Sequence, residues 1–150
     1  METIFVDSPL IEVDDIALRE IDAVILSATK RYVEVQAKTK ELLERAEDRL
    51  LSGSEGTIYL KKLGHRPLSS ADFTNLVNTL GSDEDKKALV DFAQAQEALQ
   101  ERLKTTKVIG LVLEQADITR DLFYKRAKRP DLWKPEEILT VIDVLERIRV

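Results

Sequence analysis

The chain has 150 residues, a formal net charge of -5, 43% hydrophobic content and no cysteine, which excludes disulfide staples and thiolate chemistry. Its length supports one modest core, or a small core with an extended helical arm. The start METIFVDSPL lacks the basic and apolar segments of a secretory signal, and no apolar run approaches the roughly 18 residues of a membrane span, so we expect a soluble cytoplasmic protein.

The first third of the chain has the pattern of a long helix. From about Val13 to Leu51 there is no Pro or Gly, and apolar residues recur at alternating spacings of three and four, a heptad seam that Thr39 and Arg49 weaken. Such a helix would be roughly 55 to 60 Å long, too long for a small domain to cover. We therefore expect the seam to hold two chains together as a homodimer, with antiparallel pairing inside one chain as the alternative. The predicted dimerisation residues are Leu18, Ile21, Ile25, Ala28, Tyr32, Val35 and Leu42.

The middle of the chain predicts shorter elements. SGSEG ends the first helix, and the following TIYLKKLGHRPLSS is expected to be irregular or briefly extended, with TIY available to pair with the N-terminal IFV as a small ladder. Ser69 or Ser70 caps a helix that runs to Leu80 and closes at Gly81. A further helix from about Asp83 to Lys104 carries acids in its first turn, where the helix dipole favours them, and an apolar stripe that can pack on the first helix or on a second copy.

Basic residues concentrate near the C-terminus. Residues 1–99 carry 12 Lys or Arg and 19 Asp or Glu, whereas residues 100–150 carry 11 and 9. Between Thr119 and Lys134, six basic side chains accompany only Asp121 and Asp131. Local potential steers a partner, while the global sum mostly sets solubility, so the acidic total does not exclude nucleic acid. A basic run is more often a solvated face than a binding site, so the helix that carries it decides the interpretation.

From Val108 onward the spacing predicts three short helices. Val108 to Ala116 is helical, residues 116–118 form a tight turn, and Thr119 is a good N-cap for the next helix. Pro130 ends that helix, Trp133 is expected to pack beneath it, and Pro135 begins a last amphipathic helix. We expect the buried face of the helix that begins after Thr119 to consist of Leu122, Phe123 and Ala127. The exposed face is predicted to carry Arg120, Asp121, Tyr124, Lys125 and Lys128, a set that suits a helix lying in a DNA major groove.

Residues 107–148 resemble the small helix-turn-helix domains of the lambda-repressor-like and phage or plasmid regulator type. ADITRDLFYKRAKRPDLW followed by KPEEILTVIDVL is similar to the turn, recognition helix and closing helix of that family. Asp117 replaces the usual Gly of the turn, and Lys134 replaces the usual Thr or Ser cap of the last helix. The resemblance implies that Thr119 caps the recognition helix and contacts a phosphate. It also implies groove-facing positions at Arg120, Asp121, Tyr124 and Lys125, with Lys128 and Arg129 near the DNA backbone.

Catalysis is not expected. The one histidine, His65, lies in GHRP with no second His or Cys to complete a metal site or a nucleophile-base pair. GSEGTIYLKK lacks the Gly-Lys-Ser/Thr of a phosphate-binding loop. The sequence therefore predicts no catalytic residue, no metal and no cofactor.

Taken together, these patterns predict an all-α protein. A long N-terminal coiled-coil-like helix packed with a second long helix would form an oligomerisation and interaction region at residues 1–106, and a tri-helical helix-turn-helix module would form a DNA-binding domain at residues 107–150. The favoured function is a sequence-specific regulator of transcription that binds double-stranded DNA as a homodimer, its half-sites about 34 to 36 Å apart. The alternative is a helical interaction or scaffold protein whose basic C-terminal face docks on an acidic protein. A protein partner at the N-terminal helices also remains open.

Overall fold

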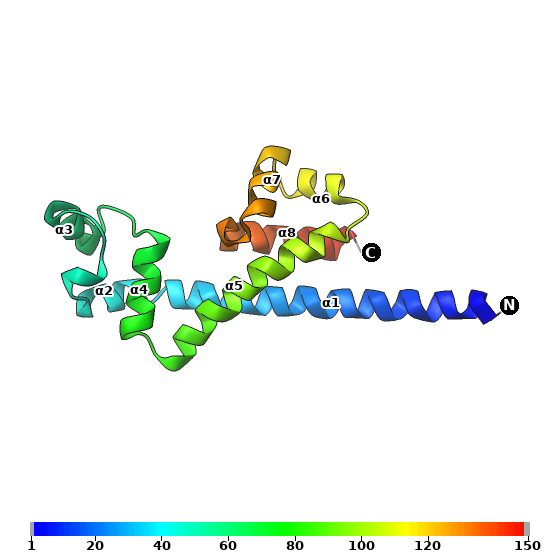
Figure 1. The fold of residues 1–150 in the computed structure, drawn as a ribbon, viewed down its shortest axis with the longest axis horizontal. Coiled ribbons are helices and arrows are strands. Elements are labelled where there is room, and N and C mark those ends of the chain that lie inside the picture. Colours follow the sequence, from blue (N-terminus) through cyan, green and yellow to red (C-terminus); the bar gives the residue numbers. More distant parts are fainter. Residues whose placement is uncertain (1, 149–150) are drawn as a thin grey trace. The chain divides into compact units, whose positions relative to one another are not determined.

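A computed structural model describes residues 2–148, with side chains from Ile16 onward. Over that range the chain forms eight α-helices and two 3-10 turns without a strand, which confirms the all-α class (Figure 1). None of the described helices is both long and apolar enough to cross a membrane. The elements are α1 (Glu2–Gln36), α2 (Thr39–Arg45), η1 (Asp48–Leu50), α3 (Glu55–Leu63), α4 (Ser70–Leu80), α5 (Asp83–Lys104), α6 (Ile109–Gln115), α7 (Arg120–Lys128), η2 (Pro130–Leu132) and α8 (Pro135–Ile148).

The chain divides into two compact units. One joins the residues up to Lys30 with those from Phe92 onward, and the other comprises Arg31–Asp91. The first unit therefore contains most of α1, the second half of α5, and α6 to α8. The boundary predicted between residues 106 and 107 falls inside this unit, in the segment that joins α5 to α6.

The Arg31–Asp91 unit has its own apolar core beneath α2 and α4, which pack against each other. A polar network lies beside that core. Lys61 Nζ donates to Asp72 Oδ2 at 2.6 Å and to the Ser52 carbonyl at 2.8 Å, and the Ser52 N–H donates to Asp72 Oδ1 at 2.8 Å. The buried core residues are Val35, Leu42, Ala46, Leu50, Leu51, Phe73, Leu76, Val77 and Ala88.

Two expectations about this unit are wrong. The first long helix ends at Gln36, and α2 and η1 follow as separate short elements, so it does not continue to Leu51. TIY lies inside α3, and IFV lies inside α1, so the small ladder does not form. Ser54 caps α3 by accepting from the Thr57 N–H, and Gly64 ends it with φ 81°, a conformation that favours glycine. These caps outweigh the strand preference of Thr57, Ile58 and Tyr59.

In the first unit α1 and α5 share a buried ion pair. Arg102 Nε donates to Asp22 Oδ1 at 3.0 Å, and both side chains are almost completely buried. Arg102 Nη1 also donates to Thr106 Oγ1 at 2.9 Å. A charge buried this deeply is tolerated only when its partner is present, so the pair fixes the register of α5 on α1.

Four of the seven residues predicted for dimerisation are buried within one chain: Ile25, Ala28, Val35 and Leu42. Leu18 and Tyr32 are half-buried, and Ile21 is exposed. A single chain therefore covers part of the predicted seam, and Val35 and Leu42 lie in the core of the Arg31–Asp91 unit. The homodimer itself stays a prediction.

Candidate nucleic-acid interface

The turn between α6 and α7 is short and firmly held (Figure 1). Asp117 has φ 58°, the one described non-glycine residue with positive φ. Asp is among the residues that tolerate this left-handed conformation, although Gly adopts it at lower cost. The Ile118 N–H donates to the Leu113 carbonyl at 2.9 Å, and the Ile118 side chain is buried. The chain therefore leaves α6, turns once and enters α7 in a fixed direction.

Thr119 begins α7 as predicted. Its Oγ1 accepts from the Leu122 N–H at 3.2 Å, and its carbonyl accepts from the Phe123 N–H at 3.0 Å. The threonine side chain thereby satisfies one of the backbone donors left free in the first helical turn.

The outer face of α7 carries the five residues predicted for it. Arg120, Asp121, Tyr124, Lys125 and Lys128 are all exposed, and Tyr124 exposes 57% of its surface. At 100° per residue they cover one side of the helix. The Arg120 guanidinium lies beside Gly110 of α6. A β-carbon at position 110 would be 3.8 Å from Arg120 Nη2.

The inner face differs from the prediction at one position. Leu122 and Phe123 are half-buried, but Ala127 is exposed, and Arg126 is the buried residue of this face. The reason is spacing, because Arg126 follows Leu122 by four residues and Phe123 by three, whereas Ala127 lies near the edge of the face.

Arg126 ties α7 to the start of α8. Its Nε and Nη2 donate to the two carboxylate oxygens of Glu137 at 3.2 and 3.1 Å, a bidentate pair. Glu137 Oε1 also accepts from the Lys134 N–H at 2.9 Å. Glu137 thus supplies a cap at a helix start where Lys134 has no side-chain acceptor. The position of Arg126, four residues after Leu122 and three after Phe123, predicts an inward side chain. The charge count alone grouped Arg126 with the exposed basic residues.

Arg129 is also paired, in this case at the surface. Its Nη2 donates to Asp131 Oδ2 at 2.7 Å, and this hydrogen bond lowers the pKa of Asp131 below its usual range. Of the six basic residues between Thr119 and Lys134, four therefore form no ion pair with any residue of the described chain: Arg120, Lys125, Lys128 and Lys134. These four make up the basic face of the module.

Trp133 anchors the segment that follows α7 through hydrogen bonds to α5. It is 2% exposed, and its Nε1 donates to Gln100 Oε1 at 3.2 Å. Gln96 Nε2 donates to the Trp133 carbonyl at 2.8 Å. Since Gln96 and Gln100 belong to α5, and α6 packs on α8, the three C-terminal helices form one body with the end of α5.

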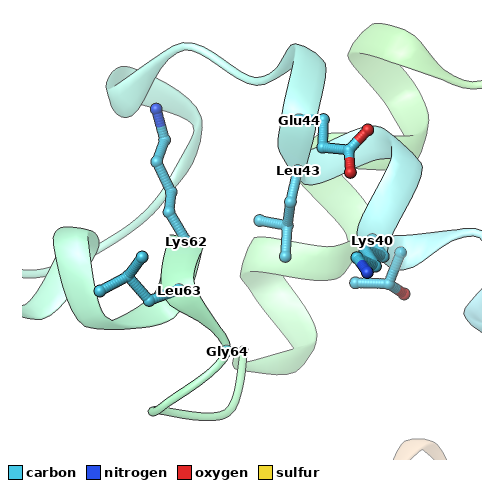
Figure 2. A pocket seen from close by; sticks show the side chains of 7 residues that line it. Lys40, Leu43, Glu44, Lys62, Leu63 and Gly64 are labelled. Carbon is cyan, nitrogen blue, oxygen red and sulfur yellow. The ribbon is translucent and has the colours of Figure 1, made fainter.

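The Arg31–Asp91 unit contains an open pocket of about 600 Å³ between α2 and the end of α3 (Figure 2). Leu43 and Leu63 supply its apolar surface. The Lys62 ammonium already contacts the Ala46 carbonyl and Asp48. The remaining charged groups that line the pocket are Lys40 and Glu44. This lining offers no paired acid and base, so α7 carries the better-defined candidate site.

Comparison of the chain with models of protein families, with curated proteins and with solved structures gave no match.

Proposed function

We propose that the protein is a sequence-specific DNA-binding regulator of transcription that reads the major groove of duplex DNA with α7. One observation carries the proposal. A helix fixed by a tight turn, a threonine cap and a buried Arg126–Glu137 pair exposes Arg120, Tyr124, Lys125 and Lys128 on a single face, and the three cations have no acidic partner among the described residues. Rigid presentation of cations and a hydroxyl suits a groove whose edges carry acceptors.

Each residue of this face has a role that follows from its chemistry. Arg120 can donate two hydrogen bonds to guanine O6 and N7, and Asp121 can accept one from cytosine N4. Tyr124 and Lys125 lie one turn further on, where a hydroxyl and an ammonium can reach base edges. Lys128 lies at the end of the helix and is assigned to a phosphate, as is the hydroxyl of Thr119.

Arg129 is a lesser contributor than the resemblance implies. Its guanidinium already pairs with Asp131, so a phosphate contact would have to replace that hydrogen bond. The basic face is therefore smaller than the sequence count of six. Selectivity must then come from α7 itself, since a weak basic patch on a chain of net charge -5 provides limited attraction to phosphates.

The test begins with selection of a preferred duplex from random sequences by the full-length protein. Binding to that site and to scrambled DNA is then measured at two salt concentrations. Arg120→Ala should weaken the selected site by about 1 to 3 kcal/mol and relax preference at one base pair. Arg120→Lys should lose preference similarly, because lysine lacks the bidentate fork. Lys128→Ala should weaken all duplexes about equally and reduce the salt slope by about one.

Lys40→Ala is the matched control. Lys40 is an exposed lysine of α2 that forms no ion pair with the described residues, and its unit, Arg31–Asp91, carries none of the proposed DNA-reading residues, so its removal should leave both affinities unchanged. If Arg120→Ala and Lys125→Ala leave both affinities unchanged while circular dichroism shows an intact fold, α7 does not read DNA. Docking of the basic face on an acidic protein would then replace the proposal.

A further inference from the structure

Helix α1 has a second apolar stripe, which the first unit leaves uncovered. Asp22 and Ile25 are buried against the chain, whereas Ala17, Ile21 and Val24, spaced by four and three residues, are exposed. Val24 exposes 66% of its surface, the highest value for a large hydrophobic residue in the described part of the chain, and Ile21 exposes 40%. An apolar helix stripe of heptad spacing is the pattern that packs against another helix.

The same spacing continues toward the N-terminus in the sequence. Val13, Leu10 and Val6 precede Ala17 at intervals of four, three and four residues. Helix α1 comprises 35 residues, which corresponds to a length of about 52 Å. The sequence thus continues the spacing of Ala17, Ile21 and Val24 over nearly three heptads, the repeat by which one helix packs against another.

A shallow depression borders the stripe. It has a volume of about 290 Å³ and lies between α1 and α5 of the first unit. Ile21 belongs both to the stripe and to the rim of the depression, so a side chain from a neighbouring helix that packs on the stripe would have a hole to enter. The lining residues are Leu18, Ile21, Ala98, Glu101, Arg102 and Thr105.

We propose that a second copy of this chain covers the stripe, with the two α1 helices antiparallel. Charge decides both the occupant and the direction. Residues 2–15 carry five acidic residues and no basic one. Residues 16–31 carry three basic and two acidic residues, of which Asp22 pairs with Arg102 and Arg31 pairs with Asp91 at 3.5 Å. Parallel pairing would bring two acidic halves together, and antiparallel pairing brings each acidic half against the basic end of the other helix.

This arrangement has a defined register. A two-fold axis beside Glu20 and Ile21 makes Ala17 of one copy oppose Val24 of the other, so a small residue faces a larger one. It also differs from the seam predicted from the sequence, with which it shares only Ile21. The proposal does not depend on DNA binding, because the oligomeric state is measured without nucleic acid.

Light scattering on the full-length protein at micromolar concentration tests the interface. The wild type should have twice the 17.1 kDa chain mass, and Val24→Asp and Ala17→Asp should each return it to the monomer mass. Val90→Asp is the matched control, since Val90 lies on α5 with 57% of its surface exposed, and it should remain a dimer. Circular dichroism confirms that each variant folds. A monomeric wild type, or a Val24→Asp protein that stays dimeric, overturns the proposal.

Cysteine cross-linking tests the direction, because the natural chain has no cysteine. In the antiparallel register the two copies of position 24 lie about 10 Å apart along the helix axis, beyond the ~7 Å Cα separation that a disulfide spans. An oxidised mixture of Ala17→Cys and Val24→Cys proteins should therefore form a cross-linked heterodimer, whereas Val24→Cys alone should not cross-link. Efficient cross-linking of Val24→Cys alone would show parallel pairing and refute the antiparallel arrangement.

Discussion

The carboxylate of Asp72 joins three segments of the Arg31–Asp91 unit. It accepts hydrogen bonds from Lys61 on α3, from the Ser52 N–H before α3, and from the Ser69 N–H at the start of α4. Burial opposes ionisation of this group, but the hydrogen bonds outweigh burial and hold the pKa of Asp72 well below its usual range. The folded unit therefore binds a proton at Asp72 less readily than the unfolded chain does.

This difference predicts the pH dependence of stability. Because the folded pKa is depressed, the stabilisation is fully present above the unfolded value of about 4 and is lost as the pH falls below it. Asp72→Asn should lower the free energy of unfolding at pH 7 by about 3 kcal/mol or more, because it leaves the buried Lys61 ammonium without its anion. The variant should also lose less of its free energy of unfolding than the wild type does as the pH falls from 7 to 3. Thermal melts at pH 7, 4 and 3 measure both effects.

Glu97→Gln provides the control for this experiment. Glu97 is exposed, lies in the middle of α5 away from both helix ends and forms no ion pair with the described residues, so its neutralisation should change neither the stability at pH 7 nor the acid response. An Asp72→Asn protein that is as stable as the wild type at pH 7 would contradict the structural role of the buried pair.

Single side chains also define what the sequence could and could not provide for the candidate site. The outer residues of α7 were predictable because 100° spacing and the Thr119 cap determine them locally. The partners of Arg126 and Arg129 were not, since Glu137 and Asp131 are acidic residues whose pairing depends on how α8 and η2 pack against α7. Charge counts therefore overstated the basic face by two residues.

At the scale of elements, the helices that begin after Ser69, Ser82 and Thr119 were predicted well from their caps, whereas α3 was missed despite the cap at Ser54. Helix α5 has the predicted bounds, and Ser82 and Asp85 form a reciprocal cap at its start. The end of α1 was missed because neither Gly nor Pro marks residues 36–39. There the chain leaves the helix so that Leu42 and Ala46 reach the core of the second unit. Packing decided that boundary, and a periodic pattern cannot show it.

The α6–α7 turn gives a prediction at this scale. Asp117 adopts φ 58°, which costs a non-glycine residue about 1 to 2 kcal/mol. Asp117→Gly should therefore keep or raise the thermal stability and leave any affinity for the proposed DNA site unchanged. Asp117→Val should lower the free energy of unfolding by at least about 1 kcal/mol, because a β-branched side chain is poorly tolerated there. Thermal melts of both variants measure this, and a Val variant as stable as the Gly variant would show that the turn is not constrained.

At the scale of the whole molecule, the division into units changes which part of the chain can act alone. A DNA-binding domain limited to residues 107–150 was expected from the sequence. However, Trp133 hydrogen-bonds to Gln100, and Gln96 hydrogen-bonds to the Trp133 carbonyl, so α5 completes the site at which this buried tryptophan lies. The contacts that hold the segment after α7 therefore include α5, which lies outside residues 107–148, the range on which the helix-turn-helix expectation was based.

This dependence predicts the behaviour of fragments. Residues 105–150 should show no cooperative thermal unfolding, because the loss of α5 exposes Trp133, and removing the burial of a tryptophan typically costs about 3 to 5 kcal/mol. Residues 82–150 retain α5 with its cap and should unfold cooperatively, although less stably than the full chain, since Arg102 loses Asp22. Circular dichroism melts and tryptophan fluorescence compare the fragments. If residues 105–150 alone unfold cooperatively and bind the selected duplex as tightly as residues 82–150, α5 is not part of the DNA-reading body.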